Sequence, residues 1–435
     1  MLRYNMLGKT GIRVSQICFG SLTVSPLGAG LSEAEGAEVI ACALQGGINF
    51  IDTAQYYRNY ETIKRGISLY TARGGRENPV ICTKTYAWNR ELAAEAVDEA
   101  RKKLGRDVID VFLLHEQESI HTLRGHMEAL EYLYECKEQG IIRAVGLSTH
   151  CVDAVYAAAE VRHSHGSGLD VVFPMFNVEG LGIRRAQSAE SFVRAAETES
   201  EHRTKSGTEN VTEAEAENRT KSGAENVTEA EAENRTKSSA ENVTEAESEY
   251  RTKTDAENVT ESEAERRAKT EAEIRISLRD DMWRAINRCR ESGIGVMLMK
   301  VFGGGHLLGA SESHRKLKNI FIRTPSERAA EALRFAIDSD CGDSIALGMQ
   351  SAEEVLENIR FFETGRFSDD FCSKVNSRRR RLVVEDYCEG CGNCVRRCGQ
   401  GAMSIVGGTA VCDSSKCVLC GYCAGVCPRF AIKVI

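Results

Sequence analysis

Short apolar runs alternate with longer amphipathic stretches along most of this chain. The runs are rich in β-branched and aromatic residues, as buried strands are, and the stretches place apolar residues three and four positions apart, as helices do. The helical pattern is clearest at residues 89–104, 122–139, 152–161 and 351–361. Eight runs are found, at Ile17–Gly20, Ile48–Asp52, Val80–Lys84, Val108–His115, Arg143–Ser148, Asp170–Asn177, Gly295–Phe302 and Ser344–Met349. Eight strands alternating with helices predict an α/β fold, a (β/α)8 or TIM barrel, because the Gly-rich first turn of an open dinucleotide-binding sheet is absent.

Polar side chains end four of these predicted strands. Asp52, Lys84, His115 and Ser148 follow one another at intervals of 32, 31 and 33 residues. Tyr57 lies in the loop after Asp52. Because the carboxyl ends of barrel strands meet at one mouth, these side chains are expected to converge there, as catalytic groups do. Taken singly, each residue has a structural interpretation, such as a helix cap or a buried core histidine. Their nearly equal spacing at successive strand ends favours a catalytic site.

A tandem repeat interrupts the barrel pattern. From Glu201 to Ala264 the motif E-x-R-T-K-x-x-x-E-N-V-T-E-x-E-x recurs with a period of 16 residues. One Val per copy supplies too little apolar surface for a packed solenoid. Glu precedes Lys by four residues in each copy, which supports a solvated helix, whereas Gly207, Gly223 and the Asn-Val-Thr steps oppose one. We expect a charged, partly helical or disordered insertion.

Two runs of C-x2-C-x2-C-x3-C occupy the C-terminal part of the chain, 29 residues apart, and each precedes a short apolar segment. A disulfide framework or a zinc site is the alternative interpretation, but zinc sites usually have separate Cys pairs, and Met1–Ser25 lacks the pattern of an export signal. The spacing predicts two [4Fe-4S] clusters with crossed ligation, in which the fourth cysteine of each run binds the other cluster. The expected ligands are Cys388, Cys391, Cys394 and Cys427 for one cluster, and Cys417, Cys420, Cys423 and Cys398 for the other.

Two family resemblances follow from these residues. The C-terminal part resembles the bacterial two-cluster ferredoxins, although Gly399 stands where a proline is usual after the first run. Residues 7–15 and Phe50–Ala54, with Tyr57 and Glu61, resemble the aldo/keto reductase superfamily. This second resemblance implies a catalytic tetrad of Asp52, Tyr57, Lys84 and His115, and a nicotinamide nucleotide bound without a Gly-rich motif. It implies nucleotide contacts at Ser148, Phe176, Asn177, Ser351, Glu357 and Asn358.

The resemblance also bears on the choice of nucleotide. Gly348 and Glu354 stand where members that prefer NADPH have Lys and Arg. A carboxylate there repels a 2′-phosphate, so NADH is favoured over NADPH.

Composition limits the partners and the compartment. The net charge is −8 and the sequence pI is about 5.8, so the composition does not indicate the basic surface that binds nucleic acid. No apolar run reaches the ~18 residues that suggest a membrane span. The 17 cysteines indicate reduced thiols and metal ligation, hence a cytoplasmic protein. A small carbonyl compound is the expected substrate, and a redox protein is a further partner to consider.

These patterns divide the chain into four segments. The barrel occupies residues 1–187 and 276–375, the charged insertion 188–275, and a small α+β ferredoxin-type domain 376–435. The combination predicts an oxidoreductase that reduces a carbonyl or oxidises an alcohol with NAD(P)H and carries two clusters for electron transfer. The alternative is an electron-transfer or binding protein, in which the barrel is a scaffold and the clusters serve a partner.

Overall fold

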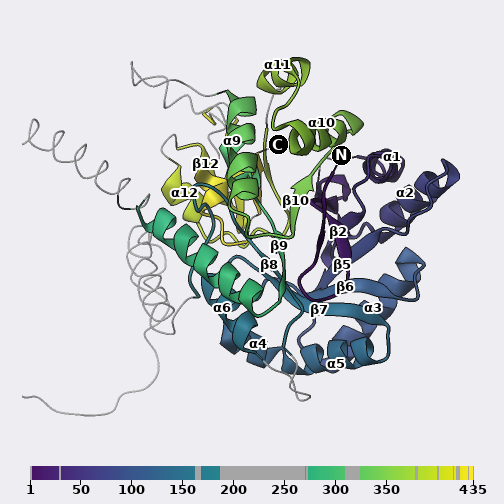
Figure 1. Cartoon of the computed structure of the whole chain (residues 1–435). Coiled ribbons are helices and arrows are strands. Elements are labelled where there is room, and N and C mark those ends of the chain that lie inside the picture. The colour runs from purple at the N-terminus through teal and green to yellow at the C-terminus, as the bar shows by residue number, and fades with distance from the viewer. Residues whose placement is uncertain are drawn as a thin grey trace, which may run out of the picture. The chain divides into compact units, whose positions relative to one another are not determined.

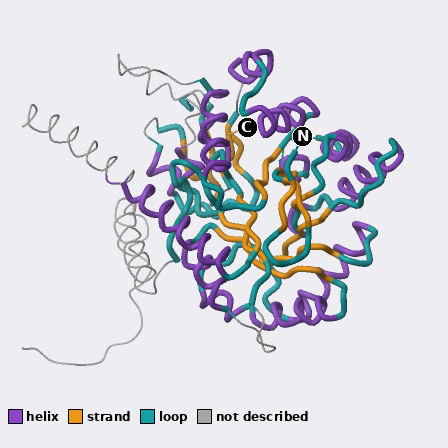
Figure 2. The backbone as a smooth tube through the Cα atoms, in the orientation of Figure 1, coloured by secondary structure: helices purple, strands orange, loops and turns teal. Residues whose placement is uncertain are grey.

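Eight parallel strands form a closed barrel (Figure 1, Figure 2). The computed structural model describes residues 2–28, 31–161, 168–186, 270, 273–308, 324–377, 381–398, 401–414, 416–417, 422–429 and 431–434. The barrel order is β10-β3-β4-β5-β6-β7-β8-β9, so that consecutive strands are neighbours and the last closes on the first. The predicted barrel is confirmed. The strands are β3 (Ile17–Gly20), β4 (Phe50–Asp52), β5 (Val80–Thr85), β6 (Ile109–Leu114), β7 (Ile142–Thr149), β8 (Val171–Pro174), β9 (Gly295–Leu298) and β10 (Ser344–Gly348).

Both faces of the strands are buried, which explains why the sequence shows continuous apolar runs. In β6, Val111 and Leu113 pack into the barrel interior, whereas Phe112 and Leu114 pack outward against the helices. The strands therefore separate an inner core from an outer core. Their carboxyl ends form one mouth, at which the polar residues of the sequence pattern lie.

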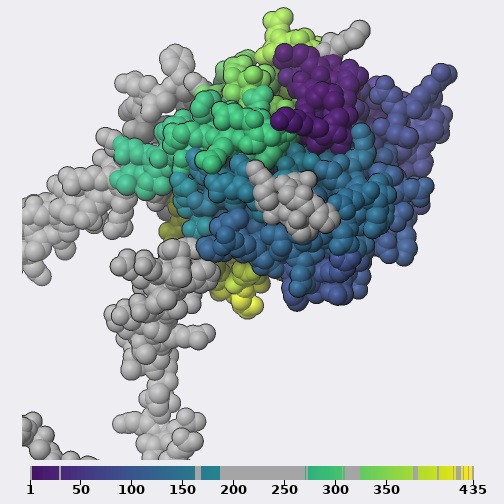
Figure 3. Space-filling view, turned by 60° about the horizontal axis from the view of Figure 1, so that its bottom comes forward, coloured from purple at the N-terminus to yellow at the C-terminus, as the bar shows by residue number. Residues whose placement is uncertain are grey.

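A hairpin that the apolar pattern did not predict fills the opposite end of the barrel. It consists of β1 (Tyr4–Met6) and β2 (Arg13–Ser15), paired antiparallel. Leu7, Ile12 and Val14 of this segment belong to the inner core. The Lys9 amide donates a 2.9 Å hydrogen bond to the Gly293 carbonyl, and the space-filling view shows the purple N-terminal segment beside the green one (Figure 3).

Helices surround the strands, and several begin with the capping residues that their sequences suggest. Ser32 and Glu35 form a reciprocal capping box at α1, and Thr324 and Glu327 do so at α9. The single helix expected at 122–139 is instead two, which meet at His126. The helices are α1 (Glu33–Gln45), α2 (Tyr60–Ala72), α3 (Arg90–Leu104), α4 (Ile120–Gly125), α5 (Met127–Glu138), α6 (Val152–Glu160), residues 273–291, α9 (Pro325–Asp338), α10 (Ala352–Thr364) and α11 (Asp369–Ser377). Short 3-10 turns are η1 (Ser21–Val24), η2 (Gln55–Tyr57) and η3 (Gly303–Leu308). No helix among the described residues is long and apolar enough to cross a membrane.

The C-terminal residues form a small module, which we call the cysteine module (residues 381–434). Two antiparallel pairs build it: β11 (Leu382–Val384) with β14 (Ile432–Val434), and β12 (Met403–Val406) with β13 (Thr409–Cys412). The short helices α12 (Asn393–Arg397) and α13 (Tyr422–Gly425) lie within the two cysteine runs. The apolar segments expected after each run are the strands β12 and β14. α13 and β14 also contact η3 of the barrel.

The chain divides into two compact units, residues 1–186 with 272–435, and residues 187–271. The first unit contains the barrel and the cysteine module. The tandem repeat of residues 201–264 lies outside the described residues, so its predicted character stays a prediction.

Deleting residues 201–264 is expected to leave a folded protein with an unchanged Tm, because length changes in a connection between elements cost little. A thermal melt followed by circular dichroism checks this. The matched control deletes residues 273–291, a helix whose Met282, Ala285 and Ile286 are fully buried, and this control should not fold. A shortened chain that aggregates would contradict the expectation.

Candidate functional site

An ion pair lies buried at the mouth of the barrel. Asp52 ends β4 and Lys84 lies near the end of β5, the neighbouring strand. The Lys84 Nζ atom donates to Asp52 Oδ1 at 2.6 Å and to the Thr53 carbonyl oxygen at 2.7 Å. Lys84 is 1% exposed and Asp52 5% exposed. The structure thus brings together two of the four predicted catalytic residues.

Burial opposes charge on both members of this pair. It raises the pKa of Asp52, and it also acts to lower the pKa of Lys84. The Asp52 carboxylate at 2.6 Å, together with Tyr57 and Cys82, outweighs the effect of burial on Lys84, whose pKa is raised above its usual value. Lys84 is therefore a cation at the mouth near neutral pH.

Tyr57 is placed over this cation by η2, the turn that follows β4. The Lys84 Nζ atom is 4.9 Å from the centre of the Tyr57 ring. Burial raises the pKa of Tyr57 to about 12, although Lys84 lowers it through its charge and a hydrogen bond. The phenol consequently keeps its proton near neutral pH, while the ammonium stabilises the phenolate that a proton transfer leaves behind.

His115 follows β6 directly and completes the predicted group of four. Its ring centre is 6.0 Å from that of Tyr57, and the side chain is 7% exposed. Burial, together with the positive charges of Lys84 and Lys300, holds the pKa of His115 well below its usual value. Its Nδ1 atom has no hydrogen-bond partner among the described residues. A neutral imidazole has one nitrogen that donates a hydrogen bond and one that accepts.

Three further aromatic side chains at this mouth were not predicted. The Tyr86 ring stacks on His115 at 4.3 Å with an interplanar angle of 23°, and its hydroxyl donates to Glu116 Oε2 at 2.8 Å. Tyr56 lies 6.1 Å from Tyr86 and 5.6 Å from Tyr387 of the cysteine module, measured between ring centres. The position of Tyr86 two residues after Lys84 was a usable signal. Nothing in the sequence around Tyr387 indicated that it lies near the barrel.

Three of the six predicted nucleotide contacts lie at the ends of β7 and β8, where each bonds or packs within the protein. Ser148 Oγ accepts from the Glu116 amide at 3.0 Å. The Asn177 side chain bonds to both the amide and the carbonyl of Leu181, at 2.9 Å each. Phe176 is 1% exposed and stacks on Phe335 of α9 at 5.3 Å. Stacking of Phe176 on a nicotinamide ring stays a prediction, since the ring has no exposed face in this structure.

The other three contacts lie on or beside α10. Ser351 is the N-cap of this helix and accepts from the Glu354 amide at 3.1 Å. Glu357 accepts from the amide and hydroxyl of Ser368, and Asn358 donates to the Glu354 carbonyl. The start of a helix attracts anions through its free amides. Here the Glu354 carboxylate already accepts from the Gln350 amide at 2.8 Å, so a carboxylate lies where a phosphate would otherwise be attracted.

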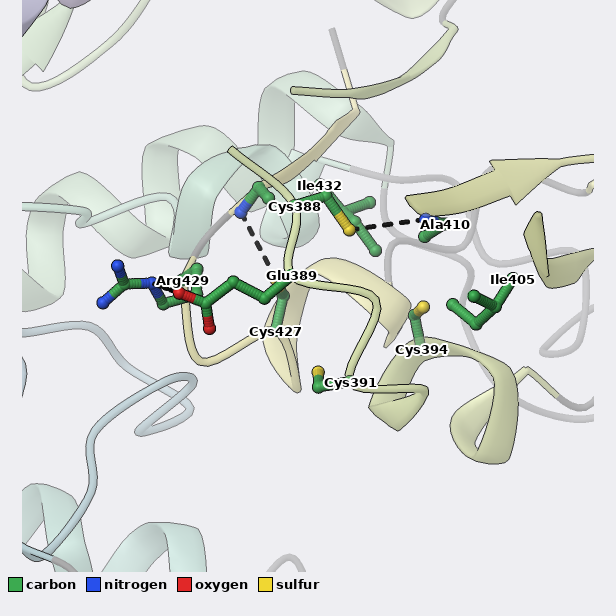
Figure 4. A pocket seen from close by; sticks show the side chains of 10 residues that line it. Cys388, Glu389, Cys391, Cys394, Ile405, Ala410, Cys427, Arg429 and Ile432 are labelled. Atoms are coloured by element: carbon green, nitrogen blue, oxygen red, sulfur yellow. Dashed lines mark hydrogen bonds and ion pairs between the residues drawn. The ribbon is translucent and has the colours of Figure 1, made fainter. Parts of the chain in front are cut away.

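Four cysteines of the module line one hollow (Figure 4). They are Cys388, Cys391, Cys394 and Cys427, the set predicted for one cluster. The Ala410 amide donates to Cys388 Sγ at 3.4 Å and the Ala431 amide to Cys427 Sγ at 3.3 Å. Amides directed at sulfur stabilise thiolates and tune a cluster. Four sulfur ligands around one hollow, two of them with amide donors, fit a [4Fe-4S] cluster.

The second predicted set is only partly described. Cys398, Cys417 and Cys423 belong to the described residues, and Cys420 lies outside them. The Ala402 amide donates to Cys398 Sγ at 3.3 Å, as the Ala431 amide does to Cys427. These two bonds stand at equivalent places of the two sequence runs. No group of His, Cys, Asp or Glu side chains in the described part of the chain converges as ligands of a single metal ion do.

Comparison with known proteins identifies both parts of the chain. Residues 16–192 match the aldo/keto reductase family, and residues 413–433 match the 4Fe-4S binding domain. The chain therefore contains an aldo/keto reductase domain followed by a 4Fe-4S binding domain, as the resemblances implied.

Similar proteins include two curated bacterial reductases. Aldo-keto reductase YhdN of Bacillus subtilis is 29% identical over 166 residues, which cover 35% of this chain and 48% of that protein. Methylglyoxal reductase DkgA of Escherichia coli is 33% identical over 124 residues, which cover 28% of this chain and 44% of that protein. This chain thus spans about half the length of the curated relatives it matches. Among solved structures, the holo form of aldo-keto reductase AKR11C1 from Bacillus halodurans has a TM-score of 0.48 at 14% identity and covers 86% of this chain and 95% of its own.

Proposed function

We propose that this chain is a nicotinamide-dependent oxidoreductase that reduces a small carbonyl compound, or oxidises the corresponding alcohol, in the cytoplasm. The arrangement of Tyr57 over the buried Lys84–Asp52 pair supports this proposal most directly. A phenol that retains its proton beside a cation is suited to protonate an oxygen on which negative charge develops.

The bound nicotinamide nucleotide would supply a hydride to the carbonyl carbon. His115 would hold the carbonyl oxygen by a hydrogen bond, next to Tyr57. Tyr57 would donate its proton to that oxygen, and Lys84 would stabilise the phenolate until solvent returns the proton. Asp52 would keep the ammonium of Lys84 in place. The four residues lie together at this one mouth.

The cysteine module would hold two [4Fe-4S] clusters, which transfer one electron at a time. Cys388, Cys391, Cys394 and Cys427 would bind one cluster, and Cys398, Cys417, Cys420 and Cys423 the other. The two runs share their spacing and their amide-to-sulfur bonds, which supports two equivalent sites. A redox protein is the partner that such clusters would serve.

The relatives suggest a small carbonyl substrate. One of them is named as a methylglyoxal reductase, and methylglyoxal is a short dicarbonyl compound. Anaerobically purified protein should oxidise NADH when supplied with short aldehydes or quinones, and absorbance at the nicotinamide band measures this. No nucleotide oxidation with any carbonyl would favour the alternative, an electron carrier with a scaffold barrel.

NADH is expected to bind more tightly than NADPH, because the Glu354 carboxylate at the start of α10 repels a 2′-phosphate. Competitive fluorescence titration of both nucleotides measures the preference. Glu354→Gln should narrow the difference, and Glu353→Gln, an exposed carboxylate one residue earlier, is the matched control. A lower dissociation constant for NADPH in the unchanged protein would contradict the charge argument.

A further inference from the structure

The barrel covers one part of the cysteine module. Arg184, in the segment after β8, donates to the Pro428 carbonyl at 2.8 Å. Lys433 of β14 donates to the Leu27 carbonyl, in the loop after β3, at 3.1 Å. These contacts involve β14 and the end of the second cysteine run. A partner protein would therefore have to approach the module at another part of its surface.

A different part of the module leaves one predicted cluster ligand open to solvent. Cys391 is exposed, whereas Cys394 and Cys427, from the same hollow, are buried. Ile405, which also lines the hollow, is 38% exposed (Figure 4). Val406, at the end of β12, is 61% exposed. Apolar side chains thus lie in solvent beside a cysteine that is expected to bind a cluster.

Two contacts fix the surroundings of Cys391. The backbone of Gly390 lies so close to the turn between β12 and β13 that a Cβ atom on Gly390 would be 2.3 Å from the Gly408 carbonyl oxygen. The guanidinium of Arg396, an exposed residue of α12, donates to the Cys391 carbonyl at 3.4 Å and to the Asn393 side chain. A positive charge is therefore held next to the exposed ligand. We call the resulting surface the exposed edge of the module, and it consists of Cys391, Arg396, Ile405 and Val406.

The exposed edge is positively charged in a chain whose net charge is −8. Residues 381–435 contain six Lys and Arg residues and four Asp and Glu residues. Three of the four carboxylates form ion pairs within the module, Glu385 with Lys433, Glu389 with Arg429, and Asp413 with Lys416. Arg396 donates to uncharged groups, so its charge can attract an acidic partner.

We propose that the exposed edge is the docking surface for a small acidic protein that carries one electron at a time. The proposal rests on the proposed function, in which the module holds [4Fe-4S] clusters. The reduced carrier would lose one electron and the cluster bound by Cys391 would gain it, so that no covalent bond changes and no proton moves. Arg396 would attract the carrier, and Ile405 and Val406 would give apolar contact beside the ligand.

The rate of cluster reduction by a carrier protein tests this surface. A reduced acidic [2Fe-2S] ferredoxin in excess is the probe, and the reduced methyl viologen cation, which needs no docking surface, is the comparison. Stopped-flow absorbance measures both rates. Arg396→Glu should slow reduction by the ferredoxin at least about fivefold at low ionic strength and should not slow reduction by methyl viologen. Arg396→Lys, which keeps the charge, should behave as the unchanged protein. Arg124→Glu, at an exposed position of α4, changes the net charge equally and is the matched control.

Val406 provides a test that leaves the bond between Arg396 and Cys391 intact. Val406→Glu should slow reduction by the ferredoxin and Val406→Lys should accelerate it, and both effects should shrink in about 1 M salt, where the screening length is about 3 Å. If Arg396→Glu lowers the iron content, the two Val406 variants decide. Clusters that methyl viologen reduces but the ferredoxin does not, or ferredoxin rates that ignore charge at both positions, would overturn the docking surface alone. Unchanged protein that binds no iron on reconstitution would overturn the clusters of the proposed function as well.

Discussion

Replacing Tyr57 with Phe is expected to lower kcat for carbonyl reduction at least about a hundredfold, the lower range for losing a general acid. Nucleotide binding should survive, because the phenol acts on the transition state and not on the cofactor. Steady-state kinetics together with fluorescence titration of NADH measures both quantities. Tyr60→Phe is the matched control, since it removes a buried hydroxyl bonded to Thr83 Oγ1 at 2.7 Å and not a catalytic one.

The pH profile offers a second readout of the same assignment. Tyr57 must be protonated to act, and its pKa of about 12 means that this form persists through the neutral and mildly alkaline range. His115 stays neutral there, because its pKa lies well below its usual value. The rate of carbonyl reduction should therefore not fall between pH 7 and pH 9 through titration of Tyr57 or His115. A Tyr57→Phe protein with unchanged turnover would show that another group supplies the proton.

Replacing Cys427 with Ser should remove one cluster and leave the other. Iron per chain should fall from about eight to about four, and the visible absorbance should fall by about half, because each [4Fe-4S] site needs four thiolate ligands. Colorimetric iron and sulfide analysis of anaerobically purified protein measures this. Cys372→Ser, on α11 and outside the module, should retain all the iron.

The crossed ligation gives this experiment an internal comparison. Cys398→Ser should affect the cluster held mainly by the second run, although Cys398 lies in the first run. If Cys427→Ser and Cys398→Ser disturbed only the clusters of their own runs, the crossed assignment would be wrong. About four iron in the unchanged protein, with no gain on reconstitution, would contradict the second cluster altogether.

The barrel strands were predictable because burial on both faces leaves an unmistakable apolar signature. The convergence of Asp52, Lys84 and His115 followed from the predicted barrel, because residues at the carboxyl ends of neighbouring parallel strands meet at one mouth. The β1–β2 hairpin was missed because two three-residue strands carry little periodicity. The break at His126 was missed because the apolar pattern runs on through both α4 and α5.

Side-chain environments were less predictable than positions. The resemblance assigned Phe176 to the nicotinamide, but its burial against Phe335 depends on the packing of α9, which no local pattern encodes. Tyr387, in contrast to Phe176, was not predicted to lie at the mouth of the barrel. Its contact with Tyr56 arises from docking of one part of the chain on another, and sequence neighbours say nothing about such a contact.

The pairing of β11 with β14 sets the order in which the module can be assembled. The strand that precedes the first cysteine run pairs with the strand that follows the second, and Lys433 of β14 forms a 2.6 Å ion pair with Glu385 beside β11. Cys427, from the later run, also completes the hollow formed by Cys388, Cys391 and Cys394. All eight barrel strands precede these elements in the chain. During synthesis the barrel can therefore close first, and iron insertion must follow the emergence of the second run from the ribosome.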